Sequence, residues 1–260
     1  MAFGLKYFLQ TGDIMTNIKI WYLYNSGFAI KLNNKLLIFD YYLDDASALS
    51  RGLDSGVIRK DDLEGLSVYV FVSHSHYDHF NRVIFSWEQW GNAAEIHYIL
   101  SSDIDAPKLP SVTILEPNAQ KIIGEVFITS LKSNDEGIAF FLEVDNIHIF
   151  HSGDLNWWNW SDETDEWKKN IESTYKMELS KLKPHPIDIA FIPVDPRLDK
   201  NYALSLQYFS REIAPANCLI FPMHFRDKLE VFEQLEKEGY LENKSILPIN
   251  SRGQLFEIIL

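Results

Sequence analysis

The chain has 260 residues, of which 46% are hydrophobic and 14% aromatic, and its formal net charge is −13. This length and apolar content fit one large folded domain and exclude a disordered protein. The acidic charge repels phosphate backbones and anionic bilayers, so we expect a small-molecule substrate and neither nucleic acid nor a membrane as partner.

The amino-terminal residues show no clear period, and Lys6 and Gln10 interrupt the apolar stretch that a signal peptide would need. No apolar run approaches the roughly 20 residues of a membrane span. The single cysteine, Cys218, lies in an apolar run and is expected to be buried. We therefore expect a cytoplasmic protein in which residues 1–14 are a poorly ordered leader, or an extension upstream of the true start, and 15–260 form a single domain.

The first half of the chain is rich in short β-branched and aromatic runs with turn residues between them. Such runs predict strands, at 18–24, 28–32, 36–41, 96–100 and 112–115. The stretch 68–73 is apolar almost throughout, which predicts a strand buried on both faces. A helix is expected to follow it over 78–87.

The second half repeats this order of elements. Strands are expected at 126–131, 138–144, 147–150, 187–194, 218–223 and 255–260. Helices are expected at 163–181, 204–213 and 227–238, the last ended by Gly239. Strands mixed with helices in both halves predict an α/β fold, a four-layer αβ/βα sandwich of two mixed sheets with helices on the outer faces.

The most informative segment follows the buried strand and places three histidines and one aspartate within residues 74–79. His74 and His76 are two residues apart, so they project to one side of an extended backbone. Asp78 and His79 come where the chain should turn, so they can reach a neighbouring point. Imidazole and carboxylate groups are ligands of zinc, manganese and iron. Two ligand groups aimed at adjacent points predict two metal ions.

This HxHxDH run at the end of an apolar strand resembles the motif of the metallo-β-lactamase superfamily, in its broad hydrolase sense. One earlier and two later segments resemble further motifs of the same superfamily. They are Leu-Ile-Phe-Asp ending at Asp40, Ser-Gly-Asp ending at Asp154, and Phe-Pro-Met-His ending at His224. Their order and spacing cover about residues 18–226. The chain is most similar to small stand-alone, lactonase-like members.

The resemblance implies a role for each of these residues. His74 and His76 would hold one metal ion, Asp154 would bridge to the second, and the ligands of the second would be Asp78, His79 and His224. Asp40 would accept a hydrogen bond from a ligand histidine, and Asp78 would orient the nucleophile as the catalytic residue. The implied cofactors are two divalent ions, zinc first and manganese or iron as alternatives. The implied reaction is attack of a metal-bridged hydroxide on an ester, lactone, amide or phosphodiester.

One ligand of the superfamily pattern is missing from this sequence. The loop over 130–137, which usually supplies a third histidine to the first metal ion, contains none. Asn134 or Asp135 could replace it as an oxygen ligand, and His151 could reach in from a strand end or support another ligand. An oxygen ligand would make the site harder and favour manganese or iron.

Several tryptophans crowd the segment after Asp154, namely Trp157, Trp158, Trp160 and Trp167. They either pack a long connection onto the core or form an aromatic wall over the metal site, with Trp157 and Trp158 as candidate substrate contacts. Arg197 follows a buried strand and either binds an anionic substrate or forms a structural ion pair. Two other functions stay open: an iron-dependent oxidoreductase on the same fold, and a non-catalytic metal-binding protein.

Overall fold

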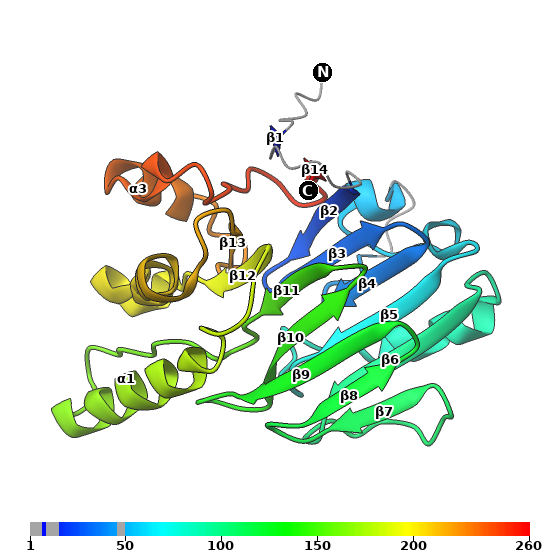
Figure 1. Ribbon diagram of the computed structural model, residues 1–260, viewed down its shortest axis with the longest axis horizontal. Coiled ribbons are helices and arrows are strands. Elements are labelled where there is room, and N and C mark those ends of the chain that lie inside the picture. The colour runs from blue at the N-terminus through cyan, green and yellow to red at the C-terminus, as the bar shows by residue number, and fades with distance from the viewer. Residues whose placement is uncertain (1–6, 9–15, 46–49) are drawn as a thin grey trace.

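Two mixed β-sheets stack face to face in the computed structural model, which describes residues 7–8, 16–45 and 50–260 (Figure 1). The first sheet has the strand order β1 (Tyr7–Phe8), β14 (Leu255–Ile259), β2 (Asn17–Tyr24), β3 (Gly27–Leu32), β4 (Lys35–Phe39), β5 (Ser67–Val72), β6 (Glu95–Ser101) and β7 (Val112–Leu115). The second has the order β13 (Leu219–Met223), β12 (Ile189–Pro193), β11 (Ile147–His151), β10 (Ile138–Val144), β9 (Val126–Lys132) and β8 (Gln120–Ile123).

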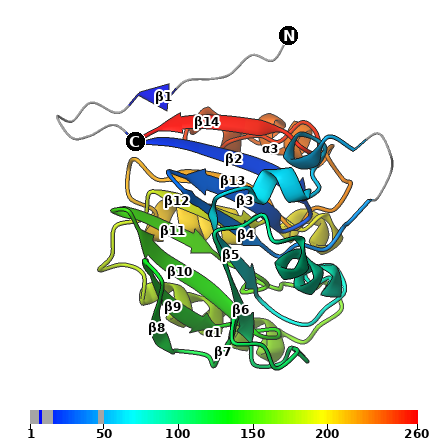
Figure 2. The ribbon, with the colours of Figure 1, turned by 90° about the vertical axis from the view of Figure 1, so that its right-hand side faces the viewer.

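Helical segments cover the outer face of each sheet, which confirms the predicted four-layer sandwich. Outside the second sheet lie α1 (Asp165–Ser180), α2 (Leu204–Tyr208), the π-helical turn η5 (Phe209–Ile213) and α3 (Val231–Lys237). The first sheet is covered by short 3-10 helices, η1 (Gly52–Ser55), η2 (Lys60–Leu63) and η3 (Arg82–Trp90), seen in front of it in Figure 2. Two further 3-10 turns, η4 (Pro196–Asn201) and η6 (Tyr240–Glu242), lie in connections.

Strand β5 shows why its sequence is apolar throughout. Val70 and its alternate neighbours belong to the outer cluster that contains Trp87 of η3, whereas Phe71 points between the sheets. The Phe71 ring stacks on Phe39 of β4 at 4.8 Å and meets Phe140 of the opposite sheet at 5.3 Å. Because successive side chains of a strand face opposite sides, a strand covered on both faces needs apolar residues at every position.

The parallel strands at the centre of each sheet position the candidate site. β4, β5 and β6 run parallel in the first sheet, and β11, β12 and β13 run parallel in the second. Their carboxyl ends meet at one end of the sandwich, where such folds present ligand-binding residues. Asp40, Ser73, Asp154, Asp195 and His224 all follow these strand ends directly or within three residues.

The predicted helix over 78–87 was wrong in its first turn. The amides of His79 and Phe80 both donate to the carbonyl oxygen of His76 at 3.1 Å, which folds this segment into a turn. Helix η3 begins only at Arg82, where the Asn81 side chain caps it by accepting from the Val83 amide at 3.0 Å. The turn frees Asp78 and His79 from helical geometry.

Smaller differences from the predictions concern where a helix begins and two strands that were not predicted. The helix expected over 227–238 begins later, at Val231, although Gly239 follows its end with φ 81° as predicted. Strand β8 was not predicted. Within the expected leader, β1 pairs in parallel with β14, and the remainder of 1–14 lies outside the described residues. Over the part of the chain that the structure describes, no helix combines the length and apolarity that crossing a bilayer requires.

Candidate metal centre

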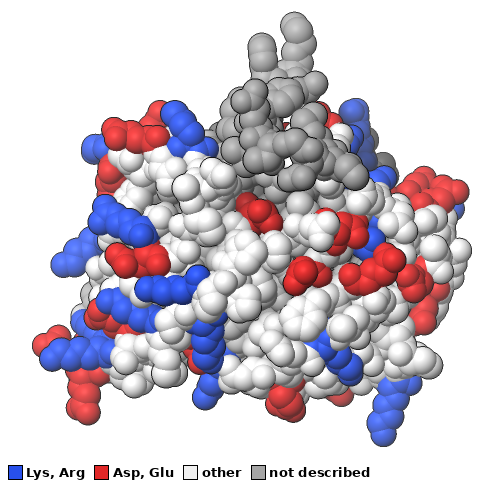
Figure 3. Space-filling model, viewed as in Figure 1, with Lys and Arg blue, Asp and Glu red and all other residues white. Residues whose placement is uncertain are grey.

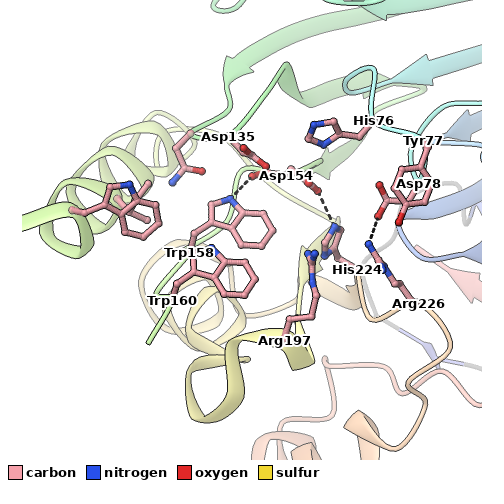
Figure 4. Close-up of a pocket in the computed structure, with 13 residues that line it drawn as sticks. His76, Tyr77, Asp78, Asp135, Asp154, Trp158, Trp160, Arg197, His224 and Arg226 are labelled. Carbon is pink, nitrogen blue, oxygen red and sulfur yellow. Dashed lines mark hydrogen bonds and ion pairs between the residues drawn. The ribbon is translucent and has the colours of Figure 1, made fainter. Parts of the chain in front are cut away.

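Two groups of potential metal ligands lie next to each other at the end of the sandwich, and Figure 4 labels His76, Asp78, Asp154 and His224 among them. Within each group the ligand atoms lie within 4.8 Å of one another. The first group is His74, His76 and Asp154, and the second is Asp78, His79 and His224. These are the two sets that the resemblance assigned to the first and second metal ions, so the structure brings all six residues together.

Asp154 contacts both groups. Its Oδ1 lies 3.1 Å from Nε2 of His79 and 3.3 Å from Nε2 of His224, and its Oδ2 lies 3.5 Å from Nε2 of His74. The preceding Gly153 has φ 51°, and a Cβ there would lie 2.7 Å from Ser73 Cβ. Only glycine therefore allows the chain to turn here and deliver the carboxylate into the cluster.

Asp40 orients two of the histidines, His79 directly and His74 through Ser73. Its carboxylate accepts from the Ser73 amide at 2.8 Å, from Ser73 Oγ at 2.7 Å and from His79 Nδ1 at 2.7 Å. Ser73 Oγ in turn lies 2.9 Å from Nδ1 of His74. With both Nδ1 atoms engaged behind the cluster, the Nε2 atoms of His74 and His79 point at Asp154, as the prediction for Asp40 required. Asp40 holds φ 43°, a strained conformation of the kind found at functional sites.

His224 is held by Asp195, which the sequence reading had not assigned to the site. Nδ1 of His224 lies 3.2 Å from Asp195 Oδ2, and Arg197 donates to the same carboxylate through Nε at 3.0 Å and Nη2 at 2.6 Å. Burial acts to raise the pKa of Asp195, but its hydrogen bonds with His224 and Arg197 outweigh burial and lower the pKa to about 2. Asp195 is therefore a permanent anion behind the histidine.

Asp78 is fixed by two residues that the sequence reading also missed. Nη2 of Arg226 lies 3.1 Å from Asp78 Oδ2, and the Asn25 side-chain amide donates to the Asp78 carbonyl oxygen at 3.3 Å. Asn25 lies in the turn expected between the strands at 18–24 and 28–32. Its position in that turn carries no sign of this contact, whereas Arg226 stands two residues after a predicted ligand, which is a usable signal.

The chemistry of the cluster fits bound metal cations. Nε2 of His79 and Oδ1 of Asp154 are buried and make no aligned hydrogen bond within the described residues, although such groups are normally satisfied. Burial lowers the pKa of His74 to about 4, which keeps that imidazole neutral and able to bind a metal ion. The donor set is nitrogen and carboxylate oxygen, which suits zinc, manganese or iron.

Metal uptake by the metal-free protein is expected to release protons. Burial favours neutral His79 and His224, but Asp154 outweighs it, raising the pKa of His224 to about 9 and that of His79 well above its usual value. Both are therefore imidazolium at pH 7 and must lose a proton to bind metal. We expect about two protons released per chain at pH 7 and tighter binding as the pH rises toward 9. Calorimetric zinc titrations in two buffers of different ionisation enthalpy measure this release, and none would contradict it.

The three candidates for the missing ligand differ in whether their side chains are already engaged in hydrogen bonds. The Asn134 side chain is engaged with the backbone of Asn156, donating at 2.9 Å and accepting at 3.2 Å. His151 uses both ring nitrogens, near Ser26 O at 2.8 Å and the Gly153 amide at 3.2 Å, so it supports the turn before Asp154 and is not free to bind metal. The Asp135 carboxylate lines the cavity and makes no hydrogen bond to any residue that the structure describes.

A cavity of about 310 Å³ opens over the ligands, and tryptophans form one of its walls. Trp158, Trp160 and Trp167 line it, as in the aromatic-wall alternative. Arg197 lines it too, and is also ion-paired with Asp195 at 2.6 Å. Trp157 does not, which corrects its proposed substrate contact. Its amide donates to Ser205 Oγ at 2.8 Å, and its ring packs at 6.1 Å from Tyr208 and under the Lys176 ammonium at 4.5 Å.

Known structures share this architecture at low sequence identity. Igni18, a metallo hydrolase from Ignicoccus hospitalis, is 15% identical with a TM-score of 0.60, covering 93% of this chain and 98% of that one. A protein from Veillonella parvula described as a possible metal-dependent hydrolase is 11% identical with a TM-score of 0.54, covering 93% and 98%. The CmlA β-hydroxylase, a diiron enzyme of Streptomyces venezuelae, is 10% identical with a TM-score of 0.55, covering 86% of this chain and 51% of that one.

Neither a protein-family model nor a curated protein sequence matches the chain. The structural likenesses, all far below 25% identity, therefore show the fold alone. The chain shares its αβ/βα fold with solved structures that are described as metal-dependent hydrolases. Hydrolases and a diiron hydroxylase share this fold, so the reaction has to be argued from the site.

Proposed function

We propose that this protein is a binuclear metal-dependent hydrolase that cleaves an ester, lactone, amide or phosphodiester bond in a small molecule. The observation that carries the proposal is the position of Asp154, whose two oxygens lie within 3.5 Å of ligand nitrogens from both groups. A single carboxylate shared by two ligand sets is the arrangement that two neighbouring cations need.

The bound cations would supply Lewis acidity, which brings the pKa of water close to 7 and polarises the oxygen of the bond under attack. The protein supplies orientation and proton transfer. Asp78 faces the cavity and is fixed by Arg226 at 3.1 Å. It can accept the proton that the attacking water loses and return it to the oxygen or nitrogen of the leaving group. Water adds across the bond, and no oxidant is consumed.

A small-molecule substrate fits the size and charge of the molecule better than a polymer. The cavity over the ligands is about 310 Å³, within the range of small-molecule sites. On the face shown in Figure 3, Lys and Arg side chains are interspersed with Asp and Glu and form no continuous basic surface over the residues described there. With a net charge of −13, we propose neither nucleic acid nor a membrane as partner.

Metal analysis and a substrate panel test the proposal. Protein purified without added metal is expected to contain two zinc, manganese or iron ions per chain and to hydrolyse members of an ester, lactone, amide and phosphodiester panel. Asp78→Ala is expected to reduce kcat at least about 100-fold, because it removes the proton-transferring carboxylate. Asp188→Ala, which breaks an ion pair with His148 away from the cluster, is the control and should keep full activity. Absence of metal in active protein would overturn the proposal.

An iron-dependent oxidoreductase is the second candidate, favoured by the likeness to the CmlA β-hydroxylase. Tight retention of iron together with consumption of dioxygen, and no hydrolysis in the panel, would support it. A protein that binds metal but turns over nothing in either assay would instead be a non-catalytic metal-binding protein.

A further inference from the structure

The cavity beside the metal ligands has one flat apolar wall. The rings of Trp158 and Trp160 stack on each other, with an interplanar angle of 3° and centroids 5.9 Å apart, and the stacked pair presents a planar edge to the cavity that Trp167 and Ile171 of α1 extend. Trp158 is fixed in place because its Nε1 donates to the Asp154 carbonyl oxygen at 3.2 Å. This wall therefore holds a constant position relative to the metal ligands and suits a planar or aromatic group.

Two guanidinium groups lie on either side of His224, to the right of the tryptophans in Figure 4. That of Arg197 lies 6.0 Å from the Trp158 ring centroid and 5.6 Å from that of Trp160. Arg197 donates hydrogen bonds to Asp195 through Nε and Nη2, and Arg226 donates to Asp78 through Nη2. Buried carboxylates therefore hold both side chains in place. Nη1 of each makes no hydrogen bond to any residue within 7–8, 16–45 and 50–260, and the side chains are 45% and 39% exposed. Oriented guanidinium groups with free N–H donors bind carboxylate and phosphate oxygens.

A second cavity of about 300 Å³ opens onto the same two arginines and is lined by Lys228 as a further cation and by the carboxylates of Asp195 and Asp227. In the cavity over the metal ligands, the lining carboxylates are those of Asp78, Asp135 and Asp154. Two divalent cations would bring four positive charges against the three negative charges of these carboxylates. The metal-loaded cavity therefore attracts anions, although the chain as a whole is acidic.

We propose that the substrate is an anionic small molecule that carries a flat apolar or aromatic group. The flat group lies against Trp158 and Trp160, a carboxylate or phosphate oxygen is bound by Arg197 and Arg226, and the bond that is hydrolysed lies between them beside Asp154. This assignment depends on the proposed hydrolase function for its reaction, but binding of the ligand does not.

Hydrolysis of two matched esters tests the anion contact. Mono(4-nitrophenyl) glutarate has a terminal carboxylate, 4-nitrophenyl pentanoate has a methyl group there, and both release the same phenol. The metal-loaded protein is expected to prefer the glutarate at least about 10-fold in kcat/KM, as loss of a charge-assisted hydrogen bond predicts. Arg226→Gln should reduce this preference several-fold, and Arg197 should supply the preference that remains. Damage to the metal ligands cancels in the ratio, since both esters undergo the same chemistry.

Arg82→Gln is the matched control, because Arg82 is also exposed and paired with an aspartate but lies outside both cavities. It should keep the wild-type preference. Equal kcat/KM for the two esters in the wild type, or an unchanged preference in Arg226→Gln, would overturn the proposal.

Binding without turnover separates this proposal from the hydrolase function. Quenching of tryptophan fluorescence would be titrated with 4-nitrobenzoate, 4-nitrophenylphosphonate and the neutral 4-nitrobenzamide, using the metal-loaded protein. The amide is expected to bind at least about 10-fold more weakly than the better anion, and the two anions show whether carboxylate or phosphate is preferred. Trp160→Ala should weaken binding of all three about 2- to 10-fold through lost ring contact. Anion preference without hydrolysis would support this proposal and contradict the hydrolase, whereas equal binding of acid and amide contradicts the proposal itself.

Discussion

Asp154→Asn is expected to abolish binding of at least one metal ion and to reduce hydrolysis about 1,000-fold or more. The substitution keeps the size of the side chain but removes the negative charge that lies 3.1 Å from His79 Nε2, 3.3 Å from His224 Nε2 and 3.5 Å from His74 Nε2. Metal-ion stabilisation of a transition state amounts to several kcal/mol, and a loss of about 4 kcal/mol corresponds to about 1,000-fold in rate. Metal content per chain and kcat/KM measure the two effects.

Glu178→Gln is the matched control for Asp154→Asn. Glu178 is also a buried carboxylate, paired with Lys181 at 2.6 Å, but it lies on α1 outside the ligand groups. Its variant is expected to keep two metal ions and the wild-type rate, whatever small loss of stability it brings. If Asp154→Asn retained two ions and more than a tenth of the activity, Asp154 would not be the shared ligand.

The strands and the first ligand motif could be predicted because their signals are local. A continuous apolar run predicted β5, and its contacts with both clusters explain why periodicity was sufficient there. Strand β8 had no such signal, since Gln120, Lys121 and Ile122 are exposed and the strand exists through pairing with β9. The false first turn of the helix after His76 has a similar cause. The side chains around it satisfy tertiary contacts that outweigh local helical preference.

The contacts of Arg226 and Asn25 with Asp78 could not be predicted because the partners are distant in the chain. Arg226 reaches Asp78 across 148 positions, and Asn25 reaches it across 53. The orientation of the two adjacent tryptophans could not be predicted for the same reason. Trp157 and Trp158 follow an irregular turn, so no alternation indicates which ring faces the cavity. The Ser205 hydroxyl, which accepts from the Trp157 amide, lies 48 positions away.

Gly137→Ala is expected to destabilise the metal-free protein by about 3 kcal/mol or more and also to weaken metal binding. Gly137 has φ 69°, and a Cβ there would lie 2.0 Å from the Ser73 carbonyl oxygen and 2.6 Å from His74 Cβ. The neighbouring Ile138 amide donates to that same carbonyl at 2.9 Å. The backbone would have to move away, and the movement would break this hydrogen bond and displace both Ser73 and His74.

Gly65→Ala separates the two causes of this loss. Gly65 has nearly the same conformation, with φ 71°, but a Cβ there would meet nothing within 4 Å. Its cost is therefore only that of placing alanine in the left-handed region, about 1 kcal/mol. Urea denaturation in the presence of a chelator measures both variants, and metal titration follows. Of the two variants, only Gly137→Ala should lose metal affinity. Gly137 packs against the strand end that carries the first ligand, whereas Gly65 does not. Equal losses of stability with unchanged metal binding in both variants would mean that the loop over 133–137 does not position His74.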